Sequence, residues 1–191
     1  MILTDYLLST PSLQWQYALQ AGVSHAVIRL PEDGGFDEAS PAHWQSLYNR
    51  FCAKGLRPVV VEPMPPGLHG HIKAGDGQRD ESIERVIQMM KAMDKVGVRI
   101  ICTNFMCHIG WYRTAHNLQE RGGALVTGFN ADDAGETAFP PITRAQLWAN
   151  YTYFVRAVTP YAERYGIRLA LHPDDPPVER LGGVERIFTS L

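Results

Sequence analysis

Apolar side chains recur at helical spacing along the chain, between residues that typically start and stop helices. The most regular face follows Ser40-Pro41, with apolar residues at positions i, i+3, i+4 and i+7: Trp44, Leu47, Tyr48 and Phe51. Serine or threonine before the first turn, proline within it and glycine after the last turn are common helix boundaries. We therefore predict helices that start at Thr10-Pro11, Ser40-Pro41, Asp80 and Thr143 and that stop at Gly22, Gly55, Gly97 and Gly166.

Short and nearly continuous apolar runs follow these helices, and one run precedes the first helix. The runs are Ile2–Leu8, His25–Leu30, Pro58–Val61, Val98–Phe105 and Ile167–Leu171. Strands that are buried on both faces have this composition. Because strands that alternate with helices pair in parallel through right-handed crossovers, the sequence predicts an α/β fold. We expect one domain over residues 1–191.

The connections differ in length at the two ends of the predicted strands. Helix-to-strand joints are very short, such as Gly97, whereas the joints that follow strands are long: Pro31–Ala39, Pro63–Arg79 and Met106–Ile142. In α/β folds the long joints at the carboxyl ends of the strands carry the functional site. We therefore expect the polar residues at those ends to share one edge of the sheet, namely Arg29, Glu62, Asn104 and His172.

Composition and charge narrow the class of protein. The chain has 191 residues, 45% of them hydrophobic, and a formal net charge of −2, so no basic surface suggests a nucleic-acid partner. No apolar run approaches the ~20 residues of a membrane span, and no secretory signal is visible. Because Cys52, Cys102 and Cys107 lack disulfide spacing, we expect free thiols and a cytoplasmic protein without a membrane partner. Phosphate-loop, dinucleotide and serine-hydrolase motifs are also absent from the sequence.

The candidate site residues combine metal ligands with cations that suit an anionic substrate. His172 precedes Pro173-Asp174-Asp175, and it is either a metal ligand or a hydrogen-bonded structural histidine. Glu62 is either a site carboxylate or the ion-pair partner of an arginine. His69 and Lys73 come from the second long joint, and Trp111 and Arg113 come from the third. Arg113 either binds a carboxylate through its guanidinium or is a solvated loop residue.

Three groups of motifs together resemble the mannonate dehydratases. The most specific is the string Leu169–Pro177, LALHPDDPP, at the end of an apolar run. The others are Ile101–Met106 followed by Gly110–Thr114, and Val60–Pro63 followed by His69, Ile72 and Lys73. The resemblance implies a metal-dependent TIM barrel of the xylose-isomerase-like superfamily. Such an enzyme dehydrates D-mannonate to 2-keto-3-deoxy-D-gluconate in hexuronate breakdown, using Mn²⁺ or Fe²⁺.

The resemblance also implies roles for individual residues. His172 matches a metal ligand, and five residues match positions around the substrate: His69, Lys73, Asn104, Trp111 and Arg113. Glu62 is an alternative ligand, and Asp174 or Asp175 is the expected acceptor that orients the His172 ring. The sequence departs from the family pattern at Gly110 and at Gly70-His71, where acidic residues are usual, so substrate preference is expected to differ.

Length is the largest departure from the family. A complete (β/α)₈ barrel takes about 250 residues, whereas this sequence predicts about five β/α units. The resemblance implies that the remaining metal ligands and the main acid/base residues come from later strands, beyond Leu191. Because a five-stranded piece leaves open edges, we expect a homo-oligomer. Two other functions stay open: a metal-dependent sugar isomerase or epimerase that uses Glu62 as ligand or base, and a non-catalytic fragment that serves as an assembly or binding module.

Overall fold

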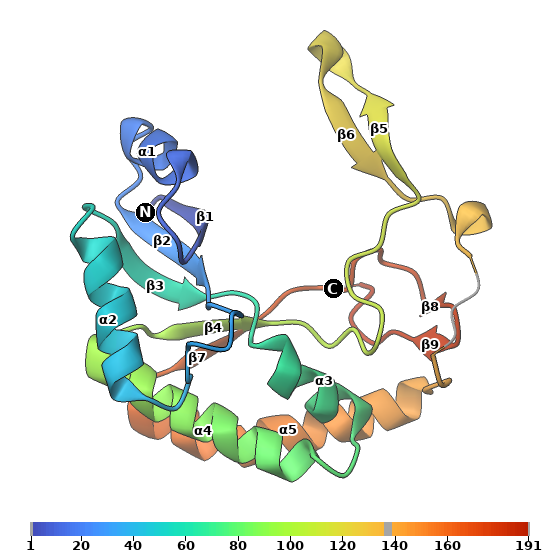
Figure 1. Cartoon of the computed structure of the whole chain (residues 1–191). Helices are drawn as coiled ribbons and strands as arrows, with labels where there is room; N and C mark the ends of the chain where they lie inside the picture. The colour runs from blue at the N-terminus through green and yellow to red at the C-terminus, as the bar shows by residue number, and fades with distance from the viewer. Residues whose placement is uncertain (1, 136–138, 191) are drawn as a thin grey trace.

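The computed structural model describes residues 2–135 and 139–190 and confirms the α/β class. Five strands form one parallel sheet in the order β1-β2-β3-β4-β7 (Figure 1). They are β1 (Thr4–Leu8), β2 (His25–Arg29), β3 (Arg57–Val61), β4 (Ile100–Thr103) and β7 (Arg168–Leu171). Each apolar run of the sequence supplies one of these strands, so the predicted sheet is correct in order and direction.

Five α-helices lie in the described part of the chain. They are α1 (Leu13–Gln20), α2 (Pro41–Cys52), α3 (Pro66–Ala74), α4 (Arg79–Val96) and α5 (Arg144–Tyr165). Ser40 caps α2, and Thr143 forms a capping box with Gln146, as the sequence predicts. Helix α1 begins later than predicted, with Ser12 rather than Thr10 at its N-cap. Ser9, the residue after β1, still donates its hydroxyl hydrogen bond to the carbonyl of Arg29 at the end of β2. The chain therefore stays beside the sheet for longer than we predicted before α1 begins.

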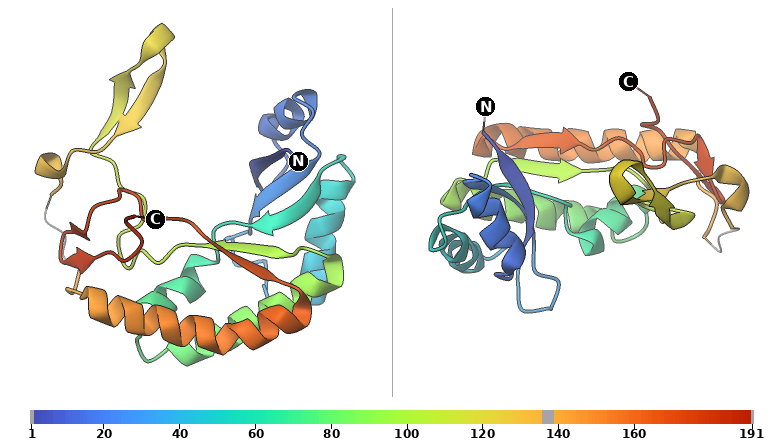
Figure 2. Two further views of the ribbon diagram at one scale, coloured as in Figure 1. Left: turned by 180° about the vertical axis from the view of Figure 1, so that it is seen from behind. Right: turned by 90° about the horizontal axis from the view of Figure 1, so that it is seen from above.

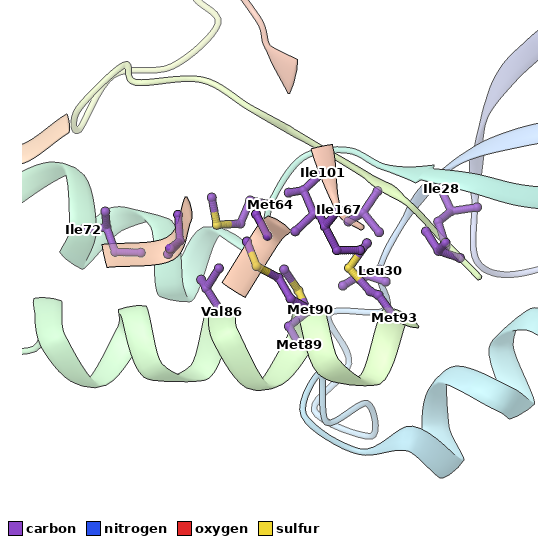
Figure 3. Packing of buried hydrophobic residues seen from close by; sticks show 14 of the residues in the cluster. Ile28, Leu30, Met64, Ile72, Val86, Met89, Met90, Met93, Ile101 and Ile167 are labelled. Carbon is purple, nitrogen blue, oxygen red and sulfur yellow. The ribbon is translucent and has the colours of Figure 1, made fainter. Parts of the chain in front are cut away.

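Helices α1, α2, α4 and α5 lie along one face of the sheet, whereas α3 packs on α4 and α5 beyond the carboxyl ends of the strands (Figures 1 and 2). Helix α4 lies between α2 and α5, and α1 joins α2 through Trp15, whose ring stacks on Phe51 with centroids 4.0 Å apart. Figure 3 shows Met90 and Met93 of α4 beneath Ile101 of β4. Flexible methionine side chains fill the irregular space between the curved sheet and the straight helix.

The strand register decides which side chains face the helices. Leu7 pairs with Ile28, Ile28 with Val61, and Val61 with Ile101, and each of the four is at most 1% exposed. Side chains alternate between the two faces of a strand. The residue after each of these four therefore points away from the helices: Leu8, Arg29, Glu62 and Cys102. This register brings the polar ends of the strands to the face that the helices do not cover.

Two of the long joints contain elements that we did not predict. Helix α3 occupies the joint after β3, and the joint after β4 contains an antiparallel hairpin of β5 (Ala115–Gln119) and β6 (Leu125–Gly128). Short 3-10 turns at Arg121–Gly123 and Ala131–Asp133 and a small pair of β8 (Arg180–Leu181) and β9 (Val184–Glu185) complete the fold. The sequence predicts a shaped loop over Pro63–Arg79, which is wrong for Pro66–Ala74, because α3 starts at a proline and includes Gly67 and Gly70.

Two expectations from the sequence concern membrane-spanning segments and cysteines. None of their helices combines the length and the apolar character that crossing a bilayer requires. The three cysteines are free thiols, as their spacing predicts.

Gly75 ends α3 in the left-handed conformation, with φ 67°. A Cβ atom there would also lie 2.4 Å from Oδ1 of Asn150 on α5. We expect Gly75→Ala to lower the free energy of unfolding by about 1–2 kcal/mol, because an alanine is strained at this φ and collides with α5. Gly77→Ala is the matched control, since a Cβ atom at Gly77 would meet no other atom within 4 Å. Urea denaturation measures both; equal losses would contradict the argument.

Candidate active site

A pocket of about 640 Å³ opens at the carboxyl ends of β3, β4 and β7, beside α3. Six of the predicted site residues line it: Glu62, His69, Lys73, Asn104, Trp111 and His172. The expectation that Glu62, Asn104 and His172 meet at one edge of a parallel sheet is therefore confirmed. Arg29 lies in a neighbouring hollow of about 390 Å³, where it forms an ion pair with Glu32 at 2.9 Å.

Lys73 brings a positive charge into this pocket from the last turn of α3. Its Nζ donates to Oδ1 of Asn104 at 2.7 Å, and the same oxygen accepts from the backbone N–H of Met106. Burial lowers the pKa of Lys73 from 10.5 to about 8, so the amine still carries a proton at pH 7. Among the described residues no carboxylate forms an ion pair with Lys73. A pocket cation held only by a neutral amide is well suited to bind an anion.

His69 lies one helical turn before Lys73 and is only 2% exposed. Its Nε2 is 2.8 Å from the hydroxyl oxygen of Thr103 on β4, and its ring meets Phe105 edge-on. Burial, followed by the charge of Lys73, holds the pKa of His69 well below its usual value. The ring is therefore neutral at physiological pH and acts as a polar wall of the pocket rather than as a second cation.

His172 directly follows β7 and is exposed to the pocket. Its Nδ1 lies 2.6 Å from the carbonyl oxygen of Pro173, which can only accept, so Nδ1 is the donor and Nε2 is the nitrogen that can bind a metal. This carbonyl takes the place in which we expected Asp174 or Asp175 as acceptor. Asp174 instead accepts from the backbone N–H groups of Ile187 and Phe188, at 3.0 and 2.9 Å.

Arg113 and Asp175 form a bidentate ion pair across the loops that follow β4 and β7. The two N–H···O distances are 2.6 and 2.7 Å, and the guanidinium lies 4.3 Å from the centre of the Trp111 ring. The hydrogen bonds from Arg113 hold the pKa of Asp175 below its usual value. Arg113 thus binds a carboxylate, as its side chain allows, but this carboxylate belongs to the protein and Arg113 does not line the pocket.

Glu62 directly follows β3 and lies beside Cys102 of β4, and both line the pocket. Burial, together with the adjacent Glu62 carboxylate, raises the pKa of Cys102 to about 11. The sulfur therefore stays a neutral thiol at pH 7. Since the thiolate is the nucleophile, Cys102 is not an activated nucleophile in this environment.

The structure adds three pocket residues that our sequence analysis did not single out as a group. Nδ1 of His71 lies 2.8 Å from Oδ2 of Asp76, and His108 lines the same pocket with an unusual positive φ of 57°. The hydrogen bond from His71 lowers the pKa of Asp76. The histidine and aspartate in the joint Pro63–Arg79 were visible in the sequence. Only the turn of α3 into Gly75, however, brings them into contact.

The described residues do not by themselves complete a metal site. No three His, Cys, Asp or Glu side chains in ranges 2–135 and 139–190 are arranged to hold an ion. His172 has the chemistry of one ligand, because its Nδ1 is taken up by the Pro173 carbonyl and its Nε2 forms no hydrogen bond with the described residues. Glu62 lines the same pocket. His172 and Glu62 together supply one imidazole and one carboxylate, fewer than a stable divalent site needs.

Comparison with known sequences finds mannonate dehydratases. The family model described as D-mannonate dehydratase (UxuA) matches residues 19–140 and 133–191. Mannonate dehydratase from Streptococcus agalactiae serotype Ia is 33% identical over 173 residues, which cover 77% of this chain and 49% of the relative. Mannonate dehydratase 2 from Halalkalibacterium halodurans is 29% identical over 171 residues, with 76% and 49% covered. The chain spans about half the length of the curated relatives that it matches.

Solved structures agree with this result. The mannonate dehydratase from Streptococcus suis serotype 2 superimposes with a TM-score of 0.83 at 25% identity, over 100% of this chain and 58% of that protein. A D-psicose 3-epimerase from Clostridium cellulolyticum H10 matches with a TM-score of 0.57 at 13% identity, over 91% of this chain and 52% of that one, and shows a shared fold alone. Since the family model covers most of the chain and the fold agrees, the chain belongs to the D-mannonate dehydratase (UxuA) family.

Proposed function

We propose that this chain supplies the substrate-binding part of a metal-dependent sugar-acid dehydratase that converts D-mannonate to 2-keto-3-deoxy-D-gluconate and water. The observation that carries the proposal is the cation of Lys73, which forms no ion pair with the described residues, in a pocket at the strand ends of a chain from this family. A sugar acid brings one carboxylate and several hydroxyl groups. The pocket offers one cation for the carboxylate and amide and imidazole groups for the hydroxyls.

The pocket residues have separate roles in this proposal. Lys73 binds the substrate carboxylate, and the amide of Asn104, which already fixes the amine, donates to a hydroxyl group. Neutral His69 keeps a second charge out of the site, so that one carboxylate is balanced by one ammonium. Trp111, which is 58% exposed, forms a wall of the pocket at its mouth.

The proposed cofactor is Mn²⁺ or Fe²⁺, with His172 as one ligand through Nε2. A divalent ion beside a carboxylate stabilises the negative charge that develops when the proton on the adjacent carbon leaves. The remaining ligands and the main acid/base groups then come from strands that the described residues do not include, as the family resemblance implies. Pro173 orients the His172 ring through its carbonyl oxygen, so that the lone pair of Nε2 is available at the pocket.

Activity of the complete enzyme, with the strands that supply the remaining ligands present, tests this proposal directly. With Mn²⁺ or Fe²⁺ present, D-mannonate should disappear and a 2-keto acid should form in equal amount. We expect His172→Ala to lower turnover at least 10–100-fold and to reduce bound metal, because a ligand should matter no less than the groups that orient it. His25→Ala is the control, since His25 begins β2 at the opposite edge of the sheet.

Other outcomes would contradict the proposal in recognisable ways. Ketose–aldose interconversion without loss of water would favour the isomerase or epimerase instead. A chain that neither turns over D-mannonate nor binds it, with or without metal, would be the non-catalytic module. Wild-type activity and metal content in His172→Ala would refute the ligand assignment alone.

Lys73→Met separates binding from stability. Burial penalises the protonated amine, so the folded chain binds fewer protons than the unfolded chain between the folded pKa of about 8 and the ordinary value of 10.5. Stability of the wild type therefore rises with pH across this range. Below pH 8 we expect Lys73→Met to be more stable than the wild type by on the order of 1–3 kcal/mol, a gain that vanishes above about pH 10.5, while sugar-acid binding is lost.

Urea denaturation at pH 7 and pH 10.5 and calorimetric titration with D-mannonate measure these two effects. Lys91→Met is the matched control, because Lys91 is exposed on α4. Undiminished binding by Lys73→Met would remove Lys73 from the proposed substrate site.

A further inference from the structure

Asp76 fixes the ring of His71 at one side of the pocket. The two carboxylate oxygens of Asp76 have separate partners: Oδ1 accepts from the backbone N–H of Gln78 at 2.9 Å, and Oδ2 lies 2.8 Å from Nδ1 of His71. The hydrogen bond from His71, followed by that from Gln78, lowers the pKa of Asp76, so the carboxylate is ionised at pH 7 and can only accept. Nδ1 of His71 is therefore the donor.

This hydrogen bond decides what the other ring nitrogen of His71 can do. In a neutral imidazole one nitrogen donates and the other accepts. Because Nδ1 donates to Asp76, Nε2 is the acceptor, and it forms no hydrogen bond with the described residues. His71 also lines the pocket. The pair of His71 and Asp76 thus offers the pocket an oriented imidazole whose role in binding the substrate is still unassigned.

Helix α3 brings His71 and Lys73 to the pocket from different sides. The two residues are two positions apart, so they lie about 200° apart around the helix axis. Between them lies a face of small residues, Gly67, Gly70 and Ala74, and all five residues line the pocket. A Cβ atom at Gly67 or Gly70 would meet no atom of the described chain within 4 Å beyond the helix backbone. A ligand can therefore lie close to α3 between the amine and the imidazole.

The two groups select different parts of a ligand. The ammonium of Lys73 has only donors and suits a carboxylate, whereas Nε2 of His71 accepts a hydrogen bond and suits a hydroxyl group. A ligand with its carboxylate at Lys73 has to cross the small-residue face of α3 before it reaches His71. A short hydroxy acid contacts the amine alone, while a longer sugar acid contacts both groups.

We infer that His71 is a specificity-determining residue of this site: its Nε2 accepts a hydrogen bond from a hydroxyl group at the end of the substrate that is remote from the carboxylate. The contact favours sugar acids with a long hydroxylated chain over short ones. Asp76 is a positioning residue, which acts through the His71 ring. The inference rests on the proposed function, because it takes Lys73 as the group that binds the substrate carboxylate.

Two ligands of different length test the inference on the complete enzyme. L-erythronate has the same configuration as D-mannonate at the two carbons next to the carboxylate, but it ends at the fourth carbon. Titration calorimetry without metal measures binding without turnover. We expect His71→Ala to weaken the binding of D-mannonate about 3–10-fold, as the loss of one hydrogen bond predicts, and to leave L-erythronate unaffected.

Two further variants show that the effect belongs to the acceptor. His71→Gln should recover part of the affinity for D-mannonate, because its side-chain carbonyl accepts a hydrogen bond. His25→Ala is the matched control, since His25 begins β2 and does not line the pocket. Alanine is a good helix former, so α3 should persist in His71→Ala, and circular dichroism checks this.

The outcomes separate the failure of this inference from that of the proposed function. A wild type that binds neither acid, or Lys73→Met that binds both as tightly as the wild type does, would refute the substrate site and this inference with it. The inference alone is overturned if His71→Ala binds D-mannonate as well as the wild type does, or loses affinity for both acids equally. ¹⁵N NMR of the wild type is a check that needs no ligand: a neutral His71 ring with its proton on Nε2 would also overturn the inference.

Discussion

Parallel pairing of the five main strands is the constraint on which the rest of the molecule depends. Each strand is connected to the next by a helix that packs on the same face of the sheet, so all five strands run in one direction. Their carboxyl ends meet at one edge, and the common register turns Glu62 and Cys102 to the side without helices. The pocket is thus a consequence of strand direction, and its chemistry comes from the residues that happen to follow each strand.

The amine of Lys73 lowers the stability of the folded protein. A partly buried ammonium that forms no ion pair with the described residues is costly, and the lowered pKa of Lys73 reflects that cost. Helix α3 nevertheless keeps the amine in the pocket, because Asn150 of α5 donates to the carbonyl of Lys73 at 2.9 Å and Oδ1 of Asn104 accepts a hydrogen bond from the amine. Groups that destabilise the free protein and are still held by several contacts are typical of binding sites.

The sequence predicts the regular part of the fold well, for physical reasons that are local. Helix α5 has a capping box at Thr143 and a left-handed stop at Gly166, and both are visible as residue types. Helix α3 was missed because Gly67 and Gly70 weaken its helical pattern, which is stabilised by packing against α4 and α5. The residues at the strand ends were predictable from topology. Their hydrogen-bond partners were not, since Arg113 and Asp175 are 62 positions apart.

Those distant contacts decide how precisely the site is built. The loops after β4 and β7 are joined by the Arg113–Asp175 pair and by Arg186, which is 1% exposed and donates to the carbonyls of Ile109 and Gly110. Asp174 fixes the same terminal segment to the loop that begins at His172. Buried charges on these two loops cost desolvation energy that apolar residues would not. A hydrophobic contact tolerates sliding, whereas a directional hydrogen bond does not. The hydrogen bonds between the two loops therefore fix the position of Trp111 on the loop after β4 and of His172 on the loop after β7. In the sequence these four residues are scattered charges: Arg113, Asp174, Asp175 and Arg186. Only the folded structure shows that they hold the two loops of the site together.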